Sequence, residues 1–515
     1  MAAQVQVRQI EESSPVHKGW AAKGFWLLLY AGLLACVELH HEMYIDETQV
    51  WLLARDSRSV IEMLGHLRYE GHPALWYLLV YPLAHLHIGL GSMQVLNYLI
   101  SLVMAVLLLT ERRISAGLRV LLLFGVFPFF HMGVLVRSYM LAAVLLVAAA
   151  RCLTGKRPRR LLAMVFLALA INTHFLAIPV AASIFLWLYW LRSGDSLRTA
   201  LSRVRQAEWL QMAGVVLAGL LLCYLTVRPA PDLATPHYDV AGLNSFDYLL
   251  IATGRVWNYF VPIPLGLLPT HLQDLLTPWQ QPSLVAVALS LALGTVVIAS
   301  LPSRQSRYFV LTAWLLFLAV IALTTRRPTP FHTSFMWVAY AIGLTLTTTG
   351  SNGRPWLNRY LAPQIVTLLL GVQLLGSLIY GLQDIHFAFS GAKATADYLR
   401  SSGLVDRPLI IEPDSAAPSI LAYTGVSSAY FPTCHCSGSF TVFRRGRDVN
   451  QQVTLMEFKQ VERDRGAVPV VISHTKLTDG FLQETGLRQV YQSPHGVFFA
   501  LEDLTVYAAG KDGSK

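Results

Sequence analysis

The chain has 515 residues, of which 54% are hydrophobic and 14% are charged, and its formal net charge is +10. Soluble proteins carry about 25% charged residues, so most of this surface is expected to contact lipid. The basic residues fall in short clusters between apolar runs, as in the cytoplasmic loops of membrane proteins. We therefore expect no nucleic-acid partner, because the basic residues are not gathered on one face or tail.

The first 24 residues are polar, and no small-residue cleavage site follows the apolar run that begins near Phe25. We expect residues 1–24 to be a cytoplasmic segment and the first apolar run to remain as a membrane helix. Runs that can span a bilayer, about 17–25 residues each, recur as far as Leu382. The twelve runs cover residues 25–41, 73–90, 93–110, 118–135, 138–152, 160–176, 177–191, 209–227, 283–301, 308–325, 334–349 and 361–382.

The character of the chain changes after the last apolar run. Residues 391–515 mix polar and apolar positions, and strand-like runs alternate with helix-like ones. These runs lie at 393–402, 408–412, 451–464 and 468–473. The fold class is therefore expected to be an α-helical polytopic membrane protein with roughly eleven to thirteen transmembrane helices over residues 25–390. A small C-terminal α/β domain outside the membrane would follow.

Clusters of lysine and arginine between the apolar runs set the orientation. The four clearest clusters lie at residues 151–160, 198–205, 304–307 and 354–359. With all four in the cytoplasm, residues 228–282, residues 326–333 and the C-terminal domain lie on the opposite side. A cytoplasmic N-terminus and an external C-terminus require an odd number of passes. One run, either 73–90 or one of the pair around Pro128, is therefore expected to be re-entrant, unless a further pass exists.

The segment after the first apolar run carries the most chemical information. Asp46 and Glu47 begin an amphipathic stretch in which Val50, Trp51 and other apolar residues fall on one face. Such a stretch, within an external loop at residues 42–72, predicts a helix that lies along the membrane surface. Acidic residues at a helix start serve either as caps that complement the helix dipole or as functional groups.

Basic residues converge on the same external face. Arg137 begins one apolar run, His174 ends another, and Arg326 and Arg327 lie between two runs on the side where topology disfavours arginine. Charge at such a boundary is more often functional than incidental. Arginine can hold phosphate oxygens at two points. A carboxylate beside such cations fits sugar transfer from a membrane-anchored phosphate, because the base accepts the acceptor's proton and the cations stabilise the departing phosphate.

The order of these segments resembles the GT-C superfamily of membrane glycosyltransferases, in particular the lipid A aminoarabinose transferases and the protein O-mannosyltransferases. Those families have Asp-Glu after the first membrane helix, Ala-Arg in a surface helix, and a basic residue before Pro. The matching residues here are Asp46-Glu47, Ala54-Arg55 and His72-Pro73, and Val136-Arg137-Ser138-Tyr139 resembles an Arg-x-Tyr-x-Leu motif. The chain departs from the pattern at Ile45, where Pro or Gly is common, and at Gly71-His72, where an acid and Lys are common.

The resemblance implies inverting transfer of a sugar from a polyprenyl-phosphate donor to a glycan, lipid or protein acceptor. The reaction would occur on the periplasmic face of the inner membrane, with no metal and no cofactor besides the donor. It implies that Asp46 is the catalytic base and that Glu47 orients it or its partner. Arg326, Arg327 and Arg137 would bind the donor phosphate. The substrate pocket would be lined by Arg55, Arg68, Tyr69, His72, Tyr139 and His174.

Other interpretations of the sequence stay open. The chain could be a lipid-linked-sugar flippase, which would need ionisable residues buried in mid-span, or a non-catalytic subunit of a polysaccharide export assembly. His40, His41, Glu42 and Asp46 contain metal-ligand residue types, but their spacing matches no metal motif. Cys434-His435-Cys436 could form a tight disulfide or a metal-binding tract.

Overall fold

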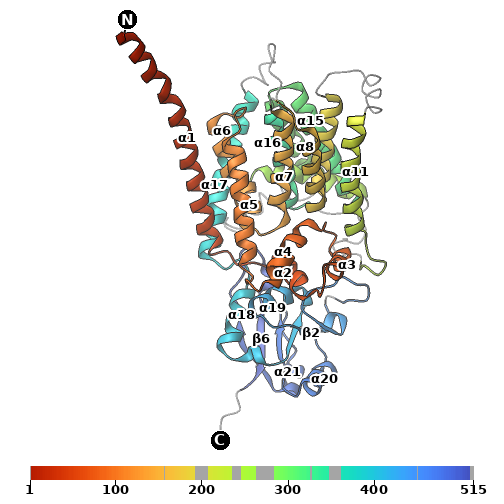
Figure 1. Cartoon of the computed structure of the whole chain (residues 1–515). Coiled ribbons are helices and arrows are strands. Elements are labelled where there is room, and N and C mark those ends of the chain that lie inside the picture. The colour runs from red at the N-terminus through yellow and green to blue at the C-terminus, as the bar shows by residue number, and fades with distance from the viewer. Residues whose placement is uncertain are drawn as a thin grey trace.

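The computed structural model describes residues 2–155, 157–191, 207–234, 245–262, 283–324, 328–346, 361–448 and 450–510. A bundle of helices forms one part of the molecule, and a smaller domain containing a β-sheet packs at one end of it (Figure 1). The first helix, α1 (Ala2–Glu38), projects beyond the bundle at its N-terminal end. The C-terminal domain predicted from the sequence is therefore confirmed.

Six helical segments in the described part of the chain are long and apolar enough to cross a membrane. They are Trp20–Glu38 of α1, α5 (Ser92–Leu109), Ala116–Val134, α11 (Ala207–Val227), α15 (Arg304–Thr324) and α17 (Ala362–His386). The segment Ala116–Val134 comprises α6 (Ala116–Phe124) and the π-helical turns of η1 (Phe127–Val134). Large apolar side chains on these helices face outward, including Leu28, Leu221 and Leu368. Outward apolar surface on several long helices fits a multi-pass membrane protein.

Shorter helices complete the bundle. Four are apolar: α7 (Ser138–Thr154), α8 (Arg160–Thr173), α9 (Ala177–Leu186) continued by η2 (Trp187–Leu191), and α14 (Leu284–Ser300). Two more are α12 (Ser245–Val256), followed by η3 (Asn258–Phe260), and α16 (Pro330–Thr345). Every residue from Thr333 to Thr345 is buried, so α16 lies in the interior of the bundle.

The predicted run at 73–90 forms only one short helix, α4 (Leu75–His85). Its 11 residues would rise about 16 Å, which is half the thickness of a bilayer core. This helix therefore does not cross the membrane alone, and it packs instead against the surface helix α2 (Ile45–Asp56). The length of α4 fits the prediction that one of the twelve runs is not a full pass.

The loop at residues 42–72, which the sequence predicts to be external, folds into α2 and α3 (Val60–Glu70), and these helices lie between the bundle and the sheet domain (Figure 1). The side chain of Glu47 accepts a hydrogen bond from the backbone N–H of Tyr44, the residue before α2, over 3.0 Å. This capping contact fixes where α2 begins. At the start of α3 the hydroxyl of Ser59 accepts a hydrogen bond from the backbone N–H of Glu62 over 3.2 Å. Gly71 ends that helix in a left-handed conformation at φ 69°, which glycine adopts without strain.

The C-terminal domain contains one six-stranded sheet in the order β3-β2-β1-β4-β6-β5. The three central strands, β2, β1 and β4, are parallel, and the outer pairings are antiparallel. The strands are β1 (Leu409–Glu412), β2 (Ala429–Phe431), β3 (Cys436–Gly438), β4 (Val470–Ser473), β5 (Leu487–Gln492) and β6 (Thr505–Ala509). The α-helices are α18 (Ala392–Ser401), α19 (Ala417–Thr424), α20 (Leu455–Arg465) and α21 (Asp479–Thr485). Short 3-10 turns lie at η6 (Leu404–Asp406), η7 (Asp414–Ala416), η8 (Pro432–Cys434) and η9 (Ala500–Glu502).

The sheet domain and the surface helices share one hydrophobic core. Leu52 and Leu53 of α2 belong to the same buried cluster as Ile411 of β1 and Ile420 of α19. A polar contact accompanies this packing, because the hydroxyl oxygens of Thr48 and Ser419 lie 3.1 Å apart. Burial of this apolar surface from both sides holds the domain against α2. The C-terminal domain thus fixes the helix that carries Asp46 and Glu47.

Candidate active site

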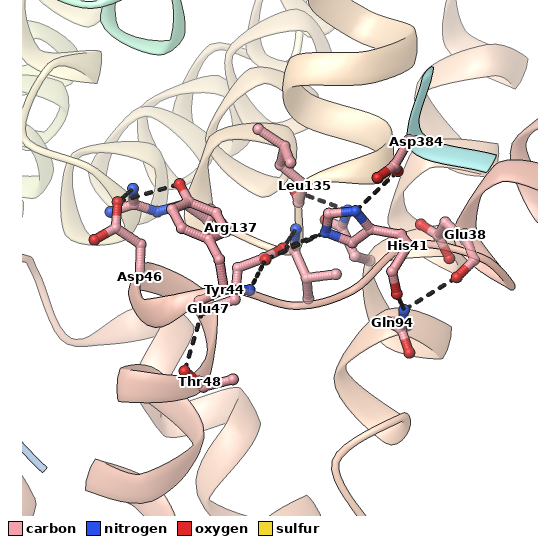
Figure 2. Close-up of polar contacts among 12 residues, drawn as sticks. Glu38, His41, Tyr44, Asp46, Glu47, Thr48, Gln94, Leu135, Arg137 and Asp384 are labelled. Carbon is pink, nitrogen blue, oxygen red and sulfur yellow. Dashed lines mark hydrogen bonds and ion pairs between the residues drawn. The ribbon is translucent and has the colours of Figure 1, made fainter. Parts of the chain in front are cut away.

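Asp46 and Glu47 begin α2, but their side chains point to different surroundings (Figure 2). The two differ because successive residues of an α-helix are separated by about 100° around its axis. The side chain of Asp46 is 45% exposed, whereas that of Glu47 is 0% exposed. Of these two acids, Asp46 is therefore the one whose carboxylate is open to the surroundings.

Arg137 is the ion-pair partner of Asp46. Its guanidinium Nη1 donates to Oδ2 of Asp46, and the hydroxyl of Tyr44 donates to the same oxygen over 3.2 Å. Arg137 immediately precedes α7 in extended backbone conformation, and its side chain is 14% exposed. The ring of Tyr139 lies beneath the guanidinium, with its centroid 5.4 Å from Cζ. A cation held by a carboxylate and an aromatic ring is oriented for binding an anion.

Two histidines extend this cluster. Nη2 of Arg137 lies 3.5 Å from Nε2 of His72. The rings of His72 and His174 have centroids 5.6 Å apart, and His174 packs on Tyr139 at 4.6 Å. The structure therefore brings together five residues that the sequence suggested for one site. They are Asp46, His72, Arg137, Tyr139 and His174.

A further carboxylate, Glu70, joins the site from the C-terminal end of α3. Gln49, on α2, donates to Oε1 of Glu70 over 2.8 Å and also bonds the backbone of Thr441 in the C-terminal domain. Burial raises the pKa of Glu70 to about 7, although the hydrogen bond from Gln49 opposes the shift, and the negative charge of Asp46 raises it further. Sequence reasoning missed Glu70, although an acid three residues before Pro73 was a signal one position from the family pattern.

Glu47 is enclosed by donors. Its Oε1 accepts from the backbone N–H of Val136 over 2.5 Å, and its Oε2 accepts from that of Tyr44. Nε2 of His41 lies 3.2 Å from Oε2, and Nδ1 of the same ring lies 2.9 Å from Asp384 of α17 (Figure 2). Because Val136 directly precedes Arg137, this contact ties Glu47 to the backbone beside the ion-pair partner of Asp46.

No family model matches the chain, and no curated protein matches it. The crystal structure of ArnT from Cupriavidus metallidurans matches 96% of this chain and 100% of that chain, with a TM-score of 0.51 and 13% identity. The cryo-EM structure of the arabinofuranosyltransferase AftD from Mycobacteria matches 95% of this chain and 40% of that chain, with a TM-score of 0.35 and 14% identity.

The chain therefore shares the overall fold of the ArnT structure. This finding confirms the fold class expected from the sequence, a helical membrane protein with a small C-terminal domain. Asp46 lies at the start of α2, the helix that packs between the helix bundle and the C-terminal domain (Figure 1).

Three other residues suggested by the sequence make contacts around the rim of the site. Arg55, at the far end of α2, pairs with Asp56 over 2.6 Å and donates to the carbonyl of Val426 in the C-terminal domain. Arg68 donates to the carbonyls of residues 228 and 229, and the hydroxyl of Tyr69 donates to Asp232 over 2.7 Å. These contacts join the surface helices to neighbouring segments. None of the three residues contacts Asp46 in the described part of the structure.

Arg326 and Arg327 lie outside the described residues, so their part in donor binding stays a prediction. Among the described residues, no group of three or more His, Cys, Asp and Glu side chains is arranged to hold a metal ion. His40 turns its Nδ1 to the carbonyl of Cys36, whereas His41 faces two carboxylates. The two cysteines of the polar region, Cys434 and Cys436, are joined by a disulfide in the C-terminal domain.

Proposed function

We propose that this protein is a glycosyltransferase that moves a sugar from a polyprenyl-phosphate donor to an acceptor on the periplasmic face, with inversion at the anomeric carbon. The observation that carries the proposal is the pair of Asp46 and Arg137, a half-exposed carboxylate bonded to a cation beside the membrane bundle. One group can accept a proton and the other can hold a phosphate, which are the two tasks of this reaction.

In the proposed donor complex, the phosphate takes the place of Asp46 beside Arg137. The donor phosphodiester carries one negative charge, and its two unesterified oxygens fit the guanidinium fork at two points. Arg326 and Arg327, which lie between α15 and α16 in the sequence, would add two further positive charges to this binding. The ring of Tyr139 and the nearby His72 keep the guanidinium oriented during the exchange. Donor binding would thereby release the Asp46 carboxylate from its ion pair.

The released carboxylate of Asp46 would then accept the proton of the acceptor hydroxyl. As this proton leaves, the acceptor oxygen bonds to the anomeric carbon, and the bond from that carbon to the phosphate oxygen breaks. The electron pair stays with the phosphate, which leaves as polyprenyl phosphate beside Arg137. Because attack and departure occur on opposite faces of the sugar, the configuration inverts.

A transfer assay tests this proposal. Purified protein in detergent would receive labelled polyprenyl-phosphate sugars, with a membrane extract as the source of acceptors. Wild type would be compared with Asp46→Asn and with Asp397→Asn, a matched control. Asp397 is also exposed, at 57%, and also pairs with an arginine, but it lies on α18 of the C-terminal domain. We expect wild type and Asp397→Asn to transfer label, and Asp46→Asn to be slower by about 10²–10⁴-fold.

Equal activity of Asp46→Asn and wild type would remove the role of Asp46 as base. A lipid-linked-sugar flippase predicts a different result: the three proteins transfer no label, but proteoliposomes carry the lipid-linked sugar across the bilayer. A non-catalytic subunit predicts neither transfer nor transport. Each outcome therefore separates the proposed enzyme from the alternatives.

A further inference from the structure

His41 is buried between two carboxylates that are remote in sequence. It follows α1, and its ring lies 2.9 Å from Oδ2 of Asp384 at the end of α17 and 3.2 Å from Oε2 of Glu47 at the start of α2. The side chains of all three residues are 0% exposed. Phe389 covers the imidazole edge-on, with ring centroids 4.9 Å apart. Water is thus excluded from a contact that joins three segments of the chain.

The hydrogen-bond pattern identifies the charge state of this ring. Both oxygens of Glu47 already accept backbone N–H groups, one from Tyr44 and one from Val136, so this carboxylate is an acceptor in its ionised form. Both ring nitrogens of His41 face carboxylate oxygens. A neutral imidazole has one N–H, whereas an imidazolium has two. The arrangement therefore fits an imidazolium that donates to both Glu47 and Asp384.

The chain of contacts leads directly to the site. Asp384 contacts His41, His41 contacts Glu47, and Glu47 accepts the N–H of Val136, the residue before Arg137 (Figure 2). Asn97 contacts the backbone just before Val136, because its Nδ2 donates to the carbonyls of Met132, Gly133 and Leu135. The backbone that presents Arg137 is therefore held from two directions.

We propose that His41, as an imidazolium clamped between Glu47 and Asp384, is a positioning residue that sets where Arg137 meets the donor phosphate. The inference rests on the proposed function for its effect on transfer, but the clamp itself is a property of the protein without substrate. His41 and Asp384 contact no atom of Asp46 or Arg137, and they act through Glu47 and the backbone of Val136.

The sign of the pH dependence follows from the groups that face His41. They are Glu47 from α2, Asp384 from α17, Glu38 from α1, and Glu42, which pairs with Lys393 of α18. Burial lowers the pKa of His41, but the charges of Glu47 and Asp384 outweigh burial and raise it well above its usual range. The clamp is therefore complete at neutral pH and is lost as the pH rises through this raised pKa. Replacing Asp384 with Asn removes one carboxylate and moves that loss to lower pH.

Hydrogen exchange followed by mass spectrometry tests the clamp without any substrate. The measured quantity is the exchange rate, corrected for intrinsic pH dependence, of peptides that contain the Val136 amide. We expect Asp384→Asn to speed this exchange by about tenfold or more near neutral pH. The control is Glu111→Gln, which removes another buried carboxylate that pairs with Arg113 and Arg151. The control should leave the exchange of these peptides unchanged.

Kinetics then connect the clamp to the site. In Asp384→Asn the KM for the polyprenyl-phosphate sugar should rise by about tenfold, and the alkaline limb of the pH–rate profile should move to lower pH. A mere loss of stability would lower the amount of active protein without moving that limb. If wild type transfers no sugar, the proposed function fails, but the exchange result still decides the clamp.

The proposal would be overturned if the Val136 amide of Asp384→Asn exchanged as slowly as in wild type and the alkaline limb of its pH–rate profile did not move. If this variant does not fold, the pH dependence of exchange in the wild-type protein still tests the clamp. Its corrected Val136 exchange should accelerate as the pH is raised through the pKa of His41, and constant protection at alkaline pH would contradict the clamp.

Discussion

Asp46 and Glu47 are neighbours with the same charge, and the structure predicts opposite consequences for their substitution. Glu47→Gln keeps the side-chain volume but leaves one acceptor oxygen where three donors converge, from Val136, Tyr44 and His41. The amide NH2 must then face a backbone N–H that has lost its acceptor, which costs about 1–3 kcal/mol. Breaking a buried charged pair by removing one partner costs about 3–5 kcal/mol. These effects overlap, so we expect a loss of unfolding free energy of about 3–5 kcal/mol.

Asp46→Asn should behave differently, because the side chain of Asp46 is 45% exposed and its pairing with Arg137 is partly solvated. Such pairs contribute about 0–1 kcal/mol to stability. The assay is equilibrium unfolding in mixed micelles of detergent and SDS, followed by loss of helical circular dichroism. Glu47→Gln should unfold at clearly lower SDS than wild type, and Asp46→Asn should unfold near wild type while losing transfer activity. Equal stability losses in the two variants, or a larger loss in Asp46→Asn, would refute this reasoning.

Three further predictions concern the surroundings of the site. Burial raises the pKa of Glu70 to about 7, so the folded state keeps a proton that the unfolded state loses near its usual value of about 4.3. Wild-type stability should therefore fall as the pH rises between these two values, and Glu70→Gln should lose that part of the slope in unfolding titrations. Gln49→Ala removes hydrogen bonds to Glu70 and to the backbone of Thr441, so limited proteolysis should cut near Thr441 faster than in wild type. Asn97→Ala leaves three buried carbonyls without their shared donor. This change should lower the unfolding free energy by about 1–3 kcal/mol. Unfolding at the same SDS concentration as wild type would contradict this prediction.

Much of the fold could be predicted from composition and periodicity. Apolar runs mark the helices because lipid-facing and bundle-facing positions are both apolar, and the strand-like runs at 408–412 and 468–473 became β1 and β4. The run at 73–90 was harder to interpret. Hydrophobicity alone cannot distinguish a spanning helix from α4, whose apolar side chains are buried partly against α2.

The part of the site carried by local motifs was also predictable. Asp46, His72 and Arg137 each stand in a short pattern that suggested its role before any contact was known. The clamp was not predictable, because His41 and Asp384 are 343 residues apart and only the packing of α17 beside the end of α1 brings them together. Likewise, the raised pKa of Glu70 depends on burial by segments distant in sequence, which no local pattern reports.

The most direct test of the central claim is a cryo-EM structure of the Asp46→Asn protein with a polyprenyl-phosphate sugar bound. The proposed function predicts the donor phosphate within hydrogen-bond distance of the Arg137 guanidinium, with the anomeric carbon facing residue 46. A donor phosphate bound away from Arg137, with the sugar outside the cluster of His72, Tyr139 and His174, would contradict the proposed active site.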